Sequence, residues 1–234
     1  MKKLNRSAKF QSGIGILFVV LIISCRLATV NSAFAQSMVK DIFPGSGTSG
    51  PANLTNINGI LYFNADDGTN GNELWKSDGT AAGTVMVKDI FPGSGASGPA
   101  NLTNINGIFY FQANDGTNGA ELWKSDGTAA GTVMVKDIYP GAGTSFPVNL
   151  TNVNGILYFR AGDGTNGNEL WKSDGTAAGT VMVKDIYPGA GTSFPVNLTN
   201  VNGILYFRAG DGTNGNELWK SDGTAAGTVM VKDI

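Results

Sequence analysis

Short runs of adjacent apolar residues, separated by glycine-rich polar turns, recur along almost the whole chain. In the first of these units Ile60-Leu-Tyr-Phe63 and Val85-Met-Val87 are continuous apolar runs, whereas residues 53–57 alternate. The units lack the 3.6-residue period of an amphipathic helix, and apolar runs of this length between turn residues are typical of strands covered on both faces. The pattern therefore predicts an all-β fold.

Each unit predicts a meander of four short strands. Asn58-Gly59 separates the first two strand-forming runs, and Asn-Gly is the strongest short hairpin signal because both central residues of a type I′ turn need positive φ. Glycine-rich turns at 67–71 and 78–83 separate the later runs. The predicted strands cover residues 53–57, 60–63, 73–77 and 84–90.

The unit is written four times without insertions. Val39 returns at Val87, Val135, Val183 and Val231, which is a period of 48 residues, and residues 135–182 and 183–230 are identical. A period of about 40–50 residues is typical of propeller blades or solenoid repeats, and β-solenoid coils are usually shorter. We therefore predict a β-propeller of four 48-residue, four-stranded blades at 39–86, 87–134, 135–182 and 183–230, followed by a terminal strand at 231–234.

One strand is surplus to this arrangement. Met-Val-Lys-Asp-Ile occurs five times, and either 38–42 or 230–234 is unnecessary in a ring of four blades. The surplus strand can overlap the first and last blades as a clasp, and we predict a closed four-bladed ring. The alternatives are one half of an eight-bladed dimeric ring and an open β-repeat array, such as a β-solenoid or irregular sandwich, whose exposed edge seeks partners. The chain is accordingly expected to be a monomer or a homodimer.

The first 35 residues lie outside the repeats. Four basic residues at positions 2–9 precede a ten-residue apolar run at 14–23, which is shorter than the ~20 residues of a membrane-spanning helix. Ala33-Phe-Ala35 then matches the small-x-small pattern of a signal-peptidase site. We predict a signal peptide over 1–35 and a mature propeller domain over 36–234, which is secreted, extracellular or at the cell surface and has no membrane span.

The single cysteine indicates an alternative localisation. Ile22-Ile-Ser-Cys25 resembles a bacterial lipobox, so the alternative is a lipoprotein anchored at Cys25. If cleavage follows Ala35 instead, the mature chain has no cysteine, and its stability outside the cell comes from packing and not from disulfides.

Charge and composition narrow the function classes. The predicted signal takes away five basic residues, which leaves 11 basic against 18 acidic residues and a net charge of −7. Nucleic acid is therefore not expected as a partner, because it requires a basic patch. The chain has no histidine, which excludes Ser-His-Asp catalysis and His-based zinc sites. Carboxylate pairs such as Glu169 and Asp174 remain, but every unit carries the same pair, and no catalytic residue is assigned.

The repeated motif also carries a family resemblance. Glu-Leu-Trp-Lys-Ser-Asp-Gly-Thr runs over 73–80, continues into Ala-Ala-Gly-Thr and Val-Lys-Asp-Ile, and recurs from Glu121, Glu169 and Glu217. The motif resembles the bacterial ELWxxDGT repeat family, and the resemblance covers all four units. It implies a secreted or surface-associated protein with propeller-like repeats, and it implies no particular activity or substrate.

One tryptophan recurs at the same internal position of each unit. A ligand-stacking platform is one interpretation, but a residue repeated at an invariant internal position is more often structural. We predict that each ring packs in the core of its blade. The four residues are Trp75, Trp123, Trp171 and Trp219.

The acidic turn of the first unit is a calcium candidate. Its oxygen-bearing side chains stand at alternating places, as in calcium loops. Asp and Asn before Gly are also what tight turns need for backbone reasons, and the later units lose a carboxylate, since Gly162 and Gly210 replace the first aspartate. No cofactor other than calcium is expected, and the candidate calcium ligands are Asp66, Asp67, Asn70 and Glu73.

Positions that vary between otherwise similar units are the candidate binding surface. Asn64 becomes Gln112, Arg160 and Arg208 in turn, and such polar positions beside a hairpin tip are expected to be exposed. Gly50 and Gly98 become aromatic in the inter-blade connections of the last two units. The candidate ligand-binding residues are Asn64, Gln112, Arg160, Arg208, Phe146 and Phe194.

These observations favour a secreted or cell-surface, non-enzymatic propeller that acts as a binding or adhesion module for an extracellular ligand, such as a glycan or a surface protein. One alternative is a structural repeat protein that assembles through open strand edges. The other is a carboxylate-based carbohydrate-active enzyme.

Overall fold

The computed structural model describes residues 37–233, and the chain from Met38 onward is a compact unit with its own core. The predicted signal peptide and Cys25 lie outside the described residues, as does the last residue. Sixteen strands make up the described part, in which no helix is found. Accordingly, no described helix has the length and apolar character needed to cross a membrane.

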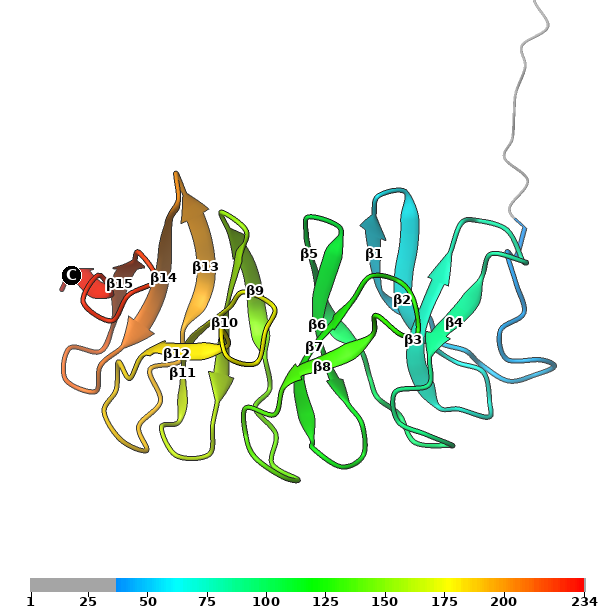
Figure 1. Ribbon diagram of the computed structural model, residues 1–234, viewed down its shortest axis with the longest axis horizontal. Helices are drawn as coiled ribbons and strands as arrows, with labels where there is room; N and C mark the ends of the chain where they lie inside the picture. Colours follow the sequence, from blue (N-terminus) through cyan, green and yellow to red (C-terminus); the bar gives the residue numbers. More distant parts are fainter. Residues whose placement is uncertain (1–36, 234) are drawn as a thin grey trace, which may run out of the picture. The chain divides into compact units, whose positions relative to one another are not determined.

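The strands form four antiparallel sheets of four, and each sheet is one sequence unit (Figure 1). Within a sheet the strands follow chain order, as predicted for a meander, so the described chain is a β-propeller of four four-stranded blades. The strands are β1 Ala52–Ile57, β2 Ile60–Asp66, β3 Asn72–Ser77, β4 Val85–Lys88, β5 Ala100–Ile105, β6 Ile108–Asn114, β7 Ala120–Ser125, β8 Val133–Lys136, β9 Val148–Val153, β10 Ile156–Gly162, β11 Asn168–Ser173, β12 Val181–Lys184, β13 Val196–Val201, β14 Ile204–Gly210, β15 Asn216–Ser221 and β16 Val229–Lys232.

The Asn-Gly hairpins form as predicted. Asn58 and Gly59 have φ of 53° and 87°, and the pairing Ile57↔Ile60 places them at the tip between β1 and β2. The second strand is longer than the apolar run suggested, because Asn64, Ala65 and Asp66 also pair with β3. The hairpin signal thus fixes the register, and pairing with β3 sets the length.

The apolar core lies between the blades. Ile57, Tyr62 and Leu74 of the first blade pack against Phe111 and Trp123 of the second. We call the face of a blade that packs against the following blade its forward face; in the first blade it comprises Ile57, Tyr62, Leu74 and Val87. The face that packs against the preceding blade is the rear face; in the second blade it comprises Phe109, Phe111, Ala113 and Trp123. The second and third interfaces repeat the first with the same positions. Each of these apolar clusters is therefore built from residues of two neighbouring blades.

The expected closed ring is not met within the described residues. On the forward face of the fourth blade Val201 is 47% exposed and Leu218 is 41% exposed, whereas the corresponding Val153 and Leu170 of the third blade are 5% and 0% exposed. The rear face of the first blade packs instead against Ile42 of the surplus N-terminal segment. The first and fourth blades therefore do not cover each other's apolar faces.

Candidate functional site

The variable positions converge on the connections between blades. Arg160 lies on β10, opposite Val148 at the start of β9, and Arg208 holds the same register on β14. Phe146 and Phe194 lie in the connections that lead into β9 and β13. In the first and third blades this position contacts the connection that enters the next blade, through Asn64 with Pro99 and Arg160 with Phe194.

Both phenylalanines have a left-handed backbone and an exposed ring. Their φ values are 48° and 53°, and the residues are 58% and 46% exposed. Gly50 and Gly98 have φ of 53° and 56° at the same position of the first two connections. This backbone conformation suits glycine and is unfavourable for a residue with a Cβ. The connection therefore keeps its geometry while the residue on it changes from glycine to an aromatic.

Arg160 and Phe194 are in contact. The Arg160 guanidinium carbon lies 3.9 Å from the centroid of the Phe194 ring, which is a cation–π arrangement. Burial lowers the pKa of Arg160, and its Nε is buried without a hydrogen-bond partner among the described atoms. Arg208, at the end of the blade series, is exposed. The two positions hold the same residue type, but among the described residues only Arg160 lies over an aromatic ring.

Asn64 corrects one expectation from the sequence. The side chain is not exposed; it is 8% exposed. Its Nδ2 donates to the Pro99 carbonyl at 3.2 Å, and its Oδ1 accepts from the Ala52 amide at 3.1 Å. A polar residue is satisfied there because it links its own blade to the next connection. Gln112, at the same position of the second blade, is partly buried.

The acidic turn is organised by its own backbone. Asp67 Oδ1 accepts from the amides of Thr69 at 2.9 Å and Asn70 at 2.8 Å, and its Oδ2 accepts from Asn70 Nδ2 at 2.8 Å. Burial tends to raise the pKa of Asp67, but these hydrogen bonds outweigh it and hold the pKa below its usual value. Asp66 accepts from the Gly68 amide at 2.7 Å. The aspartates of the turn therefore serve the loop itself.

Glu73, the fourth calcium candidate, is directed elsewhere. Its side chain is 0% exposed and accepts from the Ile90 amide at 2.8 Å, the Ser97 amide at 3.0 Å and the Ser97 hydroxyl at 2.6 Å. Burial raises the pKa of Glu73. Among the described residues no group of three or more His, Cys, Asp or Glu side chains is placed to hold a metal ion. Glu73 ties the connection that follows β4 to its own blade.

Sequence reasoning missed this carboxylate clamp. Glu121 and Glu169 bind Ser145 and Ser193 in the same way, and burial raises the pKa of each glutamate. The only available signal was the serine that recurs 24 residues after each of the three glutamates, a spacing that suggests nothing until the fold is known. Glu169, the carboxylate named for enzyme chemistry, is therefore fully buried and occupied.

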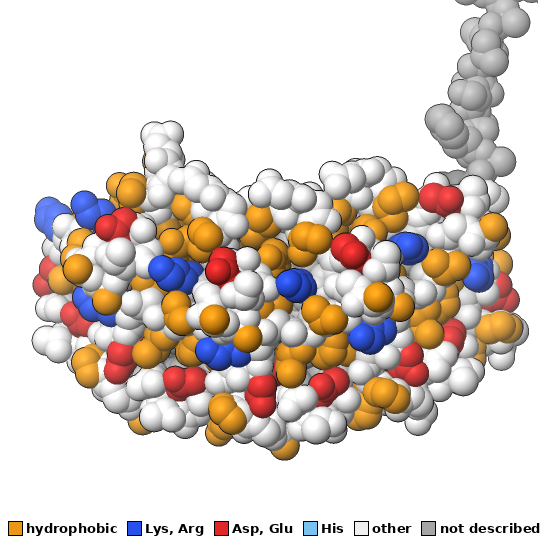
Figure 2. Space-filling model, in the orientation of Figure 1, with side chains coloured by type: hydrophobic (Ala, Val, Ile, Leu, Met, Phe, Trp, Pro, Cys, Tyr) orange, Lys and Arg blue, Asp and Glu red, His pale blue; other side chains and the backbone are white. Residues whose placement is uncertain are grey.

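Trp123, Trp171 and Trp219 lie between neighbouring blades and not within one, whereas Trp75 packs against Ile42 of the N-terminal segment. Their exposed fractions are 5–6%, and Trp123 packs against the forward face of the first blade. The Lys88 ammonium lies 5.9 Å from the centroid of the Trp123 ring and donates to the Thr132 carbonyl at 2.7 Å. Little of the ring is left for a ligand. The visible surface between the turns carries interspersed basic and acidic side chains, without an extended basic patch on that face (Figure 2).

Comparison with known proteins supports the fold alone. No family model and no curated protein matches the chain. Among solved structures, a puromycin hydrolase mutant is similar at 15% identity and a TM-score of 0.50, over 75% of this chain and 28% of that one. A prolyl endopeptidase matches at 15% identity and a TM-score of 0.47, over 74% of this chain and 24% of that one.

A third similar structure is an endo-arabinase from Bacteroides thetaiotaomicron, at 14% identity and a TM-score of 0.37, over 85% of this chain and 84% of that one. The chain spans about a quarter of the length of the puromycin hydrolase and of the prolyl endopeptidase. At such identities the likeness to the puromycin hydrolase agrees with the propeller fold and carries no activity to this chain.

Proposed function

We propose that this protein is a secreted or cell-surface, non-enzymatic propeller of the ELWxxDGT repeat type that binds an extracellular glycan. The binding surface is the aromatic–arginine platform, which we define as Phe146, Arg160, Phe194 and Arg208. The observation that carries the proposal is the pair of exposed phenylalanines held at positive φ, where the first two connections have glycine.

Folding does not account for these phenylalanines. A non-glycine residue in the left-handed region costs about 1–2 kcal/mol, and an exposed ring recovers little of it by burial. Gly50 and Gly98 show that glycine serves the same connection. A residue that is unfavourable locally and exposed to solvent is expected where a ligand is contacted.

The chemistry of the platform fits a carboxylate-bearing glycan. A flat phenyl ring offers an apolar surface to the face of a sugar, and a guanidinium pairs with a carboxylate through two parallel hydrogen bonds. The Phe194 ring already orients Arg160 at 3.9 Å. Phe146 adds a second exposed aromatic residue at the preceding connection, and linked weak contacts on one chain add avidity.

The buried carboxylates support a non-enzymatic role. Glu73, Glu121 and Glu169 are fully buried and accept hydrogen bonds from the connections. General acid and nucleophile roles in glycoside hydrolysis need a carboxyl group that reaches the sugar. These three glutamates have no such access.

Binding is tested on an array of extracellular glycans with residues 38–234 and the double variant Phe146→Gly/Phe194→Gly. This variant restores the residue that the first two connections already have. We expect affinity to fall by at least about 30-fold, because the loss of even one aromatic anchor costs about 2 kcal/mol or more, while the melting temperature is kept. Arg160→Gln/Arg208→Gln should remove the preference for acidic over neutral glycans.

The matched control is Val133→Thr/Val181→Thr, which changes two exposed apolar residues at equivalent places away from the platform. It should bind like the unchanged chain. Retained glycan binding in the double glycine variant would refute the proposed site. Platform-dependent binding to a surface protein, without glycan binding, would replace the ligand class.

A further inference from the structure

The blade series ends in an uncovered apolar face. Val201, Leu218 and Val231 on the forward face of the fourth blade are 47%, 41% and 45% exposed. Their counterparts on the third blade, among them Val183, are buried against the fourth blade. Among the described residues, the fourth blade therefore leaves open a surface that the other three blades bury.

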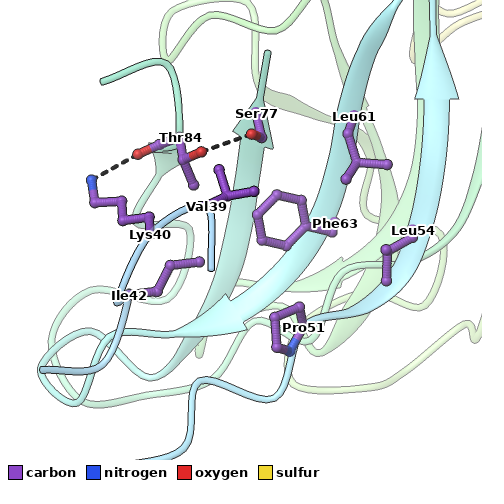
Figure 3. Close-up of a pocket in the computed structure, with 9 residues that line it drawn as sticks. All are labelled: Val39, Lys40, Ile42, Pro51, Leu54, Leu61, Phe63, Ser77 and Thr84. Atoms are coloured by element: carbon purple, nitrogen blue, oxygen red, sulfur yellow. Dashed lines mark hydrogen bonds between the residues drawn. The ribbon is translucent and has the colours of Figure 1, made fainter. Parts of the chain in front are cut away.

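The series begins with a partly filled apolar pocket. A pocket of about 230 Å³ opens on the rear face of the first blade, and Leu54, Leu61 and Phe63 line it (Figure 3). Leu54 is 60% exposed, whereas Leu198, its counterpart in the fourth blade, packs against the third blade. The pocket occupies the place that the forward face of a preceding blade fills elsewhere in the chain.

The two end faces reproduce an interface that already exists within the protein. The third blade packs Val153, Tyr158 and Leu170 against Leu205, Phe207, Ala209 and Trp219 of the fourth. At the ends of the series the same residue types stand at every one of these positions, namely Val201, Tyr206 and Leu218 on the forward face and Leu61, Phe63, Ala65 and Trp75 on the rear face.

We propose that the occupant of the first-blade pocket is the fourth blade of a second copy of this chain. The contact is head-to-tail, forward face to rear face, and is therefore heterologous. Its apolar part repeats the interface between the third and fourth blades. Its polar part is also available, because Lys172 donates to the Gly223 carbonyl of the next blade at 2.8 Å, and the corresponding Lys220 is exposed.

A segment of the chain itself competes for part of this surface. Lys40 donates to the Thr84 carbonyl at 2.7 Å and lies 5.9 Å from the Trp75 ring centroid. Lys184 makes the same contacts with Thr228, at 2.8 Å, and with Trp219, at 5.9 Å. Residues 39–42 thus hold the place that strand β16 of the second copy requires.

The segment 39–42 is the weaker competitor. Strand β16 is paired with β15 in its own blade, whereas residues 39–42 belong to no strand. Docking of the second copy therefore releases residues 39–42, and the Lys40→Ala variant should associate more tightly than the unchanged chain. Residues 39–42 are therefore a displaceable segment that covers part of the rear face of the first blade in the single chain.

The experiment is sedimentation velocity of residues 38–234 from about 1 to about 100 µM, with one variant for each face. Leu218→Glu places a charge on the forward face, and Leu54→Glu places one on the rear face. Both side chains are exposed, so the fold is kept, and circular dichroism verifies this. Each variant should associate at least about tenfold more weakly than the unchanged chain, because a buried unpaired carboxylate is costly.

Mixing the two variants distinguishes this contact from others. The mixture still contains one intact forward face and one intact rear face, so it should form a dimer that does not grow further. Val133→Glu, which adds the same charge at another exposed valine, should associate normally. The proposal is overturned if the unchanged chain stays monomeric over the range, if both face variants still associate, or if mixing restores nothing.

Discussion

The carboxylate clamp gives the sharpest test of how the blades are joined. In the Glu169→Ala variant three donors lose their acceptor: the Ile186 amide, which lies 2.9 Å from Oε2, and the amide and hydroxyl of Ser193, at 2.9 and 2.6 Å. The site is fully buried, so water does not readily replace the carboxylate.

The magnitude follows from these three hydrogen bonds. Each buried donor left without a partner costs about 1–3 kcal/mol, and removal of a desolvated carboxylate returns part of the sum. We expect the free energy of unfolding to fall by about 3–5 kcal/mol. Glu169→Gln keeps one acceptor and lets the serine hydroxyl reorient, so that only the Ile186 amide is orphaned, and its loss should be about 1–3 kcal/mol.

The assay is equilibrium unfolding in urea followed by circular dichroism. With a urea dependence of about 2 kcal/mol per molar, the midpoint of Glu169→Ala should fall by about 2 M. Glu217→Ala is the matched control, because Glu217 holds the same place in the fourth blade but is only part-buried, and we expect a smaller loss. A loss below about 1 kcal/mol, or equal losses at the two positions, would refute the clamp.

Two further predictions concern the same interfaces. Trp171→Ala should lower the free energy of unfolding by about 3–5 kcal/mol in urea titrations, since the ring is buried between the second and third blades; a loss near zero would contradict that packing. Burial raises the pKa of Glu169 above its usual 4.5, so its contribution to stability is complete below pH 4.5 and is lost as pH rises through the raised pKa. Unfolding of the unchanged chain and of Glu169→Gln, compared between about pH 4 and about pH 7, should therefore show the advantage of the unchanged chain shrinking, and an advantage that grows with pH would contradict the sign.

Local chemistry made the blade predictable. Asn58-Gly59 required positive φ at both residues, and both have it. The four apolar runs then had to pair in chain order, because turns of a few residues leave no other option. Predictions based on local sequence missed the continuation of β2 through Asn64, where a polar side chain is buried and hydrogen-bonded to the next connection. They also extended the fourth strand to residue 90, whereas β4 ends at Lys88 and the Ile90 amide instead binds Glu73.

Long-range partners explain what the sequence could not show. The Ser97 and Ile90 groups that bind Glu73 are 24 and 17 residues away along the chain, so nothing local marks the glutamate as a clamp. The contact of Arg160 with Phe194 likewise spans two blades. Variation between units did select both residues, but the left-handed backbone of Phe194 was visible only in the structure.

The near-identity of the units favours head-to-tail assembly, whereas the proposed binding platform depends on the positions at which the units differ. If each forward face fits the rear face that follows it, an uncovered first rear face and an uncovered last forward face fit each other by the same chemistry. The aromatic–arginine platform breaks this identity: Arg160 meets Phe194, whereas a docked copy would set Arg208 against Gly50, which has no ring. Each chain in a head-to-tail assembly therefore brings its own Arg160–Phe194 pair, and the interface between two chains adds no further pair. Assembly and binding are accordingly separable properties of the same repeat.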